Sequence, residues 1–176
     1  GKNFLIEKVS ALKLSEKYGS PIYCYSYNRL KKNILSLKDS FKSFTPLLCF
    51  SVKSNANINL LKEIKKLGCG ADVVSIGELV VALKAGINVN KIVFSGVGKT
   101  SKEIKYAIEK KILLINAESK SEILEIEKIS RSMNRSTNIG IRLNPNTDAK
   151  TLNKISTGKK ENKFGVTEKV FLELVG

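Results

Sequence analysis

Short apolar runs alternate with helically spaced apolar positions along most of the chain. Five runs bounded by turn-forming or polar residues predict buried strands over 47–52, 71–74, 91–94, 113–117 and 139–143. The segments between them predict helices over 57–67, 76–85, 101–111 and 120–132, and a further helix begins at Thr167. Five strand-then-helix units with short connections predict a parallel sheet with right-handed crossovers.

The residues before this alternation follow a different pattern. A short β-prone run at 21–25 predicts a strand. The segment over 27–44 has apolar residues at helical spacing and predicts a helix. We therefore expect one strand and one helix before the regular units begin at Leu47.

Polar residues stand at or just beyond the carboxyl ends of the predicted strands. They are Lys53, Asp72, Ser95, Glu118 and Arg142. A parallel α/β sheet is either an open doubly wound sheet or a closed (β/α)8 TIM-type barrel. Polar residues gathered at one end of successive strands favour the barrel. A barrel needs eight units. We therefore expect a barrel that is truncated after about five β/α units.

Lys53 is the candidate catalytic residue that the strand pattern indicates. It follows the apolar run 47–52 and precedes turn-forming residues. An amine that is partly desolvated by its strand can lose its proton near neutral pH and attack a carbonyl as a Schiff-base nucleophile. Most lysines are solvated, so position alone favours the alternative that Lys53 reaches past the strand end into water.

Composition narrows the classes of protein. The 176 residues are 42% hydrophobic and 27% charged, which is typical of one soluble globular domain. The chain has no histidine, which excludes Ser-His-Asp, Cys-His and two-histidine zinc mechanisms carried by this chain alone. No apolar run approaches the roughly 20 residues of a membrane span, and the first residues lack the apolar core of a signal peptide. We expect a cytoplasmic location and no membrane partner.

The net charge of +15 raises the alternative of a basic nucleic-acid-binding domain. The lysines are scattered, however, and many stand beside glutamates in predicted helices, as over 102–111, which is typical of solvated helix faces. A phosphate-binding loop at 96–100 is also excluded, because Val93 stands where that motif requires a glycine. Nucleic acid is therefore the less favoured partner.

Six short motifs occur in order across nearly the whole chain. They are Phe-Ser-Val-Lys-Ser-Asn at 50–55, Gly-Ala-Asp-Val-Val-Ser-Ile-Gly-Glu-Leu at 70–79, Phe-Ser-Gly at 94–96, Arg-Leu-Asn-Pro at 142–145, Ile-Ser-Thr-Gly at 155–158 and Lys-Glu-Asn-Lys-Phe-Gly at 160–165. Each motif alone is weak, but the ordered set is specific. Together they resemble the pyridoxal-phosphate-dependent decarboxylases that have an alanine-racemase-like barrel.

The resemblance implies pyridoxal 5'-phosphate as the cofactor and Lys53 as its Schiff-base lysine. It implies further that Asp72 and Arg142 line the cofactor pocket and that Ser75 and Glu78 lie near it. Taken without the resemblance, Asp72 reads as a helix-start or ion-pairing carboxylate, Glu78 as an exposed helix residue and Arg142 as a strand-end salt bridge. The implied organisation is an amino-terminal strand segment over 1–26 and a partial cofactor-binding barrel over 27–176.

The resemblance also implies a reaction. The motifs at 155–158 and 160–165 favour decarboxylation of meso-2,6-diaminopimelate to L-lysine and carbon dioxide over the same reaction of ornithine, arginine or a carboxylated polyamine. Members of the family are homodimers, and their later barrel strands and carboxy-terminal β-domain are absent from these 176 residues, which we expect to be inactive alone. The chain departs from the family at Leu152, where a histidine is common.

Overall fold

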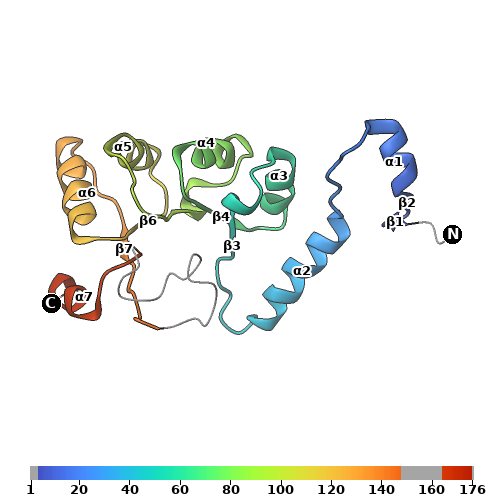
Figure 1. Ribbon diagram of the computed structural model, residues 1–176. Helices are drawn as coiled ribbons and strands as arrows, with labels where there is room; N and C mark the ends of the chain where they lie inside the picture. Colours follow the sequence, from blue (N-terminus) through green and yellow to red (C-terminus); the bar gives the residue numbers. More distant parts are fainter. Residues whose placement is uncertain (1–3, 148–163, 176) are drawn as a thin grey trace. The chain divides into compact units, whose positions relative to one another are not determined.

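The computed structural model describes residues 4–147 and 164–175 and divides the chain into two compact units, Gly1–Pro46 and Leu47–Gly176. Figure 1 traces the chain through both units. The second unit contains the alternating strands and helices, and all the candidate site residues lie in it. In the described ranges, no helix has the length and apolar character needed to cross a membrane.

The amino-terminal unit is built from short elements. The strands β1 (Leu5–Ile6) and β2 (Val9–Ser10) pair as an antiparallel hairpin, and the helices α1 (Ala11–Tyr18) and α2 (Tyr27–Ser40) follow. Ser26 caps α2 by accepting a hydrogen bond of 3.1 Å from the N–H of Arg29. None of the described residues of this unit is buried, so that part of the chain has no hydrophobic core of its own.

The predicted strand at 21–25 is wrong. The segment has no regular secondary structure, although its residues are β-prone. The two strands described in its unit, β1 and β2, pair with each other and not with it. A strand requires a neighbour for its backbone groups, which propensity alone does not supply. The helix predicted over 27–44 is confirmed but ends at Ser40, and α1 is an element that the pattern did not predict.

Parallel strands form the sheet of the second unit, in the order in which they occur along the sequence. They are β3 (Cys49–Ser51), β4 (Gly70–Val73), β5 (Ile92–Phe94), β6 (Leu114–Ala117) and β7 (Ile139–Ile141). All five predicted strands are confirmed, with small differences at their ends. The parallel register, which pairs Ser51 with Asp72 and Ala117 with Ile141, brings their carboxyl ends to one edge of the sheet.

The helices that connect these strands lie next to one another on one face of the sheet (Figure 1). They are α3 (Ile58–Lys66), α4 (Ile76–Lys84), α5 (Ser101–Lys110) and α6 (Lys120–Ser132). A doubly wound sheet reverses its strand order and carries helices on both faces. Sequential parallel strands with helices on one face are the arrangement of a (β/α) barrel, so the predicted barrel fold is confirmed and the open alternative is excluded.

The core lies between the sheet and these helices. On the sheet, alternate residues of β4, β5 and β6 point into it, among them Val73, Phe94 and Ile115, which are fully buried. Leu61 and Ile104 meet them from α3 and α5. Because side chains alternate along a strand, the residues between the core positions point to the opposite face, which in a barrel is the interior.

The chain extends the sheet beyond β7 through a pairing that the sequence pattern did not predict. Leu143 and Val166 form an isolated parallel bridge. The N–H of Val166 donates to the carbonyl of Arg142, and the N–H of Asn144 donates to the carbonyl of Val166, both at 2.8 Å. The helix α7 (Glu168–Val175) follows, which confirms the helix predicted to begin near Thr167. Val166 thus marks one strand position beyond the five that the apolar runs predict.

Glu103 ties the start of α5 to the start of α4. It forms a capping box with Thr100, and its Oε1 also accepts a hydrogen bond of 3.0 Å from the N–H of Ile76. Burial alone raises the pKa of Glu103. The hydrogen bonds from Thr100 and Ile76, together with the charge of Lys99, outweigh it and hold the pKa below the usual value of 4.5.

Replacement of Glu103 by glutamine is expected to destabilise the protein at pH 7 by a few tenths to about 1 kcal/mol, the typical contribution of a helix cap. A lowered pKa in the folded state means that the stabilisation is complete above the unfolded pKa and is lost as the pH falls through the folded pKa. Urea unfolding of both proteins between pH 7 and pH 3 should therefore show a difference that shrinks on acidification. A difference that stays constant over this range would contradict the assignment.

Candidate functional site

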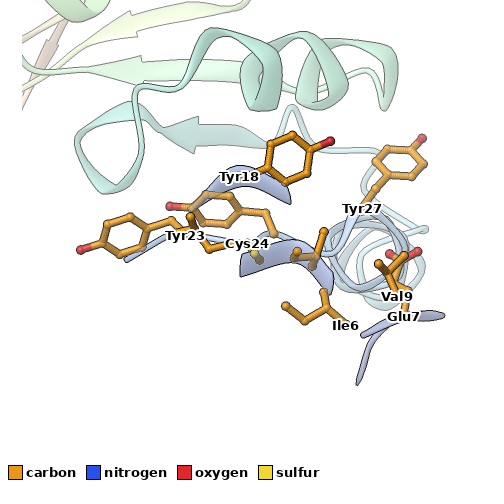
Figure 2. A pocket seen from close by; sticks show the side chains of 10 residues that line it. Ile6, Glu7, Val9, Tyr18, Tyr23, Cys24 and Tyr27 are labelled. Atoms are coloured by element: carbon orange, nitrogen blue, oxygen red, sulfur yellow. The ribbon is translucent and has the colours of Figure 1, made fainter. Parts of the chain in front are cut away.

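A tyrosine-lined pocket of about 580 Å³ lies in the amino-terminal unit. Figure 2 shows Tyr18, Tyr23 and Tyr27 among its lining residues. Its carboxylate, Glu7, accepts hydrogen bonds from the Ser26 hydroxyl (2.6 Å) and from the backbone and side chain of Asn28 (both 2.9 Å). The Ser26 hydroxyl and the Asn28 N–H lower the pKa of Glu7. Glu7 is thus committed to local structure, and the predicted chemistry lies elsewhere.

A row of polar side chains crosses the barrel-interior face of the sheet near its carboxyl edge. The residues next to Asp72 in sequence, Ala71 and Val73, are buried in the core, so Asp72 points to the opposite face. Its Oδ1 accepts a hydrogen bond of 2.6 Å from the hydroxyl of Ser95, which in turn accepts one of 3.0 Å from the side-chain amide of Asn116. These bonds link the carboxyl ends of β4, β5 and β6.

The row continues to β3 on its other side. The hydroxyl of Ser51, which pairs with Asp72 in the sheet, lies 3.5 Å from the second carboxylate oxygen, Oδ2. Two hydroxyls on neighbouring strands therefore hold the Asp72 carboxylate in one orientation. An ionised carboxylate only accepts hydrogen bonds, so a donor on a bound molecule would find an acceptor here.

Lys53 lies two residues after Ser51, in a short 3₁₀ turn, Val52–Ser54, that contacts β4. Val52 is fully buried, whereas Lys53 is exposed. Within the described ranges, its amine makes no hydrogen bond and no ion pair. Lys53 thus extends beyond the strand into solvent, as its position alone suggested, at the carboxyl edge of the sheet beside the polar row. Its role as a Schiff-base lysine stays a prediction.

Ser75 and Glu78 are arranged as a helix cap. The Ser75 hydroxyl accepts from the N–H of Glu78 (3.2 Å), and the Glu78 carboxylate accepts from the N–H of Val74 (2.9 Å). The same arrangement recurs at α6, where Ser119 and Glu122 take the equivalent places. A cap accounts for both residues locally, and their predicted position near a cofactor stays a prediction.

Arg142 follows β7 directly and pairs with Glu118. Its Nη1 lies 3.0 Å from Oε1 of Glu118, and its guanidinium carbon lies 4.9 Å from the ring centre of Phe164. The salt bridge that the sequence suggested for Arg142 is therefore present, with a buried carboxylate as its partner. The Arg142 side chain remains 40% exposed. A cation with an exposed side stands at the same edge of the sheet as Lys53 and Asp72.

Small residues stand on the interior face of the sheet beside the polar row. A Cβ at Gly140 of β7 would collide with the side-chain oxygen of Asn116 on β6. Ser51 on β3 and Ser95 just after β5 are the small polar side chains of this row. An amine, a carboxylate and a guanidinium around a face of small polar side chains fit a flat anionic cofactor such as pyridoxal phosphate, which needs a lysine and a few orienting polar groups.

Sequence reasoning placed Ser95 and Glu118 at strand ends but did not include them among the site residues, and it missed Asn116. The available signal was the alternation along each strand, since Asn116 and Glu118 flank the buried Ala117. The motif at 155–158, Leu152 and most of the motif at 160–165 lie outside the described residues. No group of three or more histidine, cysteine or acidic side chains in the described ranges is arranged to hold a metal ion.

Comparison with known proteins identifies the family. Residues 27–174 match the model of the pyridoxal-dependent decarboxylases, pyridoxal-binding domain. The chain is 49% identical over 161 residues to diaminopimelate decarboxylase of Helicobacter pylori (strain J99), covering 92% of this chain and 40% of that protein. It is 46% identical over 153 residues to the Campylobacter jejuni protein of the same name, covering 87% of this chain and 38% of that protein. The chain thus spans about 40% of the length of these relatives.

Solved structures agree with this match. The crystal structure of diaminopimelate decarboxylase from Helicobacter pylori complexed with L-lysine superposes with a TM-score of 0.89 at 47% identity, covering 93% of this chain and 41% of that one. The crystal structure of diaminopimelate decarboxylase from M. jannaschii, also in complex with L-lysine, has a TM-score of 0.88 at 37% identity, covering 98% of this chain and 41% of that one. By sequence and by fold, this chain belongs to the pyridoxal-dependent decarboxylase family, with residues 27–174 matching its pyridoxal-binding domain.

Proposed function

We propose that this chain forms the cofactor-binding barrel of an enzyme that decarboxylates meso-2,6-diaminopimelate to L-lysine and carbon dioxide. The observation that carries the proposal is the amine of Lys53, which has no hydrogen-bond or ion-pair partner among residues 4–147 and 164–175, at the carboxyl edge of the sheet beside the hydrogen-bonded carboxylate of Asp72. Because the chain spans about 40% of its relatives' length, the proposal concerns the full-length protein.

Lys53, Asp72 and Arg142 are the residues that we propose hold pyridoxal 5'-phosphate, with Ser75 and Glu78 nearby. When bound, this cofactor supplies an electron sink for the charge left on the substrate carbon by loss of carbon dioxide. Lys53 binds the cofactor through its amine. Asp72, oriented by Ser51 and Ser95, offers a fixed negative charge, and Arg142 offers a cation to an anionic group.

The names of the matched relatives support diaminopimelate as the substrate. Arginine decarboxylase from Paramecium bursaria Chlorella virus shares the fold at a TM-score of 0.62, but with only 21% identity it supports no substrate. Ornithine, arginine and a carboxylated polyamine remain the alternative substrates within the family. Carbon dioxide release from each compound by the full-length protein separates them, and we expect turnover of diaminopimelate alone.

The cofactor site is tested by reduction with borohydride in the presence of pyridoxal phosphate, followed by peptide mass mapping. We expect one modified lysine, Lys53. Lys62, an exposed lysine on α3, is the internal control and should remain unmodified. Modification of several exposed lysines to similar extents, or none at Lys53, would refute the proposed site.

Replacement of Asp72 by asparagine is expected to weaken cofactor binding about tenfold, because it removes a charge from the pocket but keeps an oxygen that can accept from Ser95. Titration with pyridoxal phosphate, followed by absorbance, measures the change in Kd. The same substitution at Asp39, an exposed residue of α2, is the matched control. If the Asp72 and Asp39 variants bound pyridoxal phosphate with equal affinity, Asp72 would not be part of the cofactor site.

The proposal also includes a homodimer, a cytoplasmic location and a division into an amino-terminal segment over 1–26 and a barrel segment over 27–176. The resemblance of the sequence motifs supports the dimer, and the start of the family match at residue 27 supports the division. Sedimentation of the full-length protein tests its assembly, and a mass corresponding to a monomer would contradict that part.

A further inference from the structure

Glu118 is a buried carboxylate at the carboxyl edge of the sheet that accepts three hydrogen bonds. It is only 4% exposed. Its Oε1 accepts hydrogen bonds from Nη1 of Arg142 (3.0 Å) and from the N–H of Gly96 (3.2 Å), and its Oε2 accepts one from the N–H of Gly165 (3.1 Å). It therefore connects the ends of β5 and β7 with the segment that begins the next strand position.

The helix cap beside Glu118 does not need its carboxylate. Ser75 and Ser119 both begin their helices at φ −156° and ψ 161°, and both accept from the N–H three residues later at 3.2 Å. The residue before Ser75 is Val74, and the residue before Ser119 is Glu118. Each uses only its backbone N–H in the cap. Since valine serves equally well there, the side chain of Glu118 has another role.

The Glu118 side chain forms an ion pair with Arg142. A buried carboxylate is costly unless a cation and further donors compensate it, and Arg142 is the cation in contact with Glu118. The ion pair and the ring of Phe164 hold the guanidinium from two sides. In the described ranges its second terminal nitrogen, Nη2, makes no hydrogen bond, so one set of donors is left for a bound anion.

We propose that Glu118 is a positioning residue that fixes the Arg142 guanidinium so that its remaining donors face the cofactor. The inference rests on the proposed function, in which Arg142 lines the cofactor pocket. Glu118 touches neither cofactor nor substrate and acts through Arg142. Glu118 also accepts a hydrogen bond from the N–H of Gly165, so one carboxylate positions both the Arg142 guanidinium and the start of the next strand position.

The test is a double-mutant cycle in the full-length protein, with pyridoxal phosphate affinity as the readout. Glu118→Gln removes the charge that holds Arg142 and should raise the cofactor Kd about tenfold, the order of one charge-assisted hydrogen bond. Arg142→Gln should raise it at least as much. If Glu118 acts through Arg142, the double variant should bind like Arg142→Gln alone.

Two controls keep the outcomes separate. Glu127→Gln removes an exposed carboxylate of α6 that also pairs with an arginine, Arg131 at 2.6 Å, and should leave the cofactor Kd unchanged. Thermal unfolding without cofactor shows whether each variant folds. If Glu118→Gln does not fold, Glu118→Asp keeps the charge but withdraws it by one methylene, and it too should raise the Kd.

Failure of this inference can be distinguished from failure of the proposed function. Absence of borohydride-trapped cofactor on Lys53 in the unmodified protein would refute the proposed site itself. With trapping intact, a wild-type Kd in the folded Glu118 variant would overturn the positioning role. The positioning role would also be overturned if Glu118→Gln raised the cofactor Kd by the same factor in the wild-type protein and in the Arg142→Gln variant. A purely structural carboxylate would weaken cofactor binding equally in both proteins.

Discussion

Replacement of Lys53 by alanine is expected to reduce decarboxylation by the full-length protein at least about 10³-fold, because the variant lacks the amine that we propose binds the cofactor. Lys99, which also follows a strand, cannot substitute for it. Its side chain is only 1% exposed, and its amine is bonded to two backbone carbonyls and a carboxylate. Steady-state release of carbon dioxide from diaminopimelate measures the loss.

Lys62→Ala is the matched control for this experiment, since it removes an exposed lysine from α3 without touching the edge of the sheet. Its activity should equal that of the unmodified protein. Thermal unfolding should show little change in either variant, because Lys53 is exposed and makes no contact of its own with a described polar group. Substantial turnover by a folded Lys53→Ala protein would exclude Lys53 as the essential amine.

Replacement of Lys99 by alanine is expected to lower the free energy of unfolding by about 3–5 kcal/mol, through an unpaired buried charge rather than through lost chemistry. The Lys99 amine donates to the carbonyls of Gly96 and Asn116, both at 2.7 Å, and to Oε1 of Glu122 at 2.8 Å. All three of its protons are used. Without Lys99, the Glu122 carboxylate, whose side chain is 9% exposed, loses its cation. Urea unfolding measures the effect.

An exposed ion pair provides the comparison. Lys66 and Glu63 on α3 lie 2.7 Å apart, with side chains 66% and 33% exposed. Lys66→Ala should cost less than about 1 kcal/mol, because solvent screens exposed charges. The double variant Lys99→Met with Glu122→Gln should be more stable than Lys99→Ala, since no buried charge remains unpaired. A Lys99→Ala variant as stable as Lys66→Ala would show that burial of this pair contributes little.

The role of Lys99 could not be predicted from the sequence motif around it. The glycines and lysine at 96–100 resemble part of a phosphate-binding loop, and one missing glycine was the ground for rejecting it. The structure supplies a positive account, because the lysine is turned inward to bond the loop and β6. Nothing in the local sequence distinguishes a lysine that binds phosphate from one that holds its own backbone.

The strands, the helices and their caps could be predicted because their signals are local. Asn57 and Thr100 accept from N–H groups two or three residues ahead, and apolar spacing repeats over single elements. The strand ends then followed, and with them the positions of Lys53, Asp72 and Arg142. The resemblance of the motifs added the family, which the comparisons confirm.

The contacts that make the candidate site had to come from the tertiary structure. Ser95 meets Asp72 across 23 residues of sequence, Arg142 meets Glu118 across 24, and Gly165 meets Glu118 across 47. Such contacts depend on the register between strands, which shifts every side chain to the other face when it slips by one residue. For the same reason the β-prone run at 21–25 formed no strand, and the pairing of Val166 went unpredicted. Local chemistry determined the elements, whereas register and packing decided which polar groups face one another.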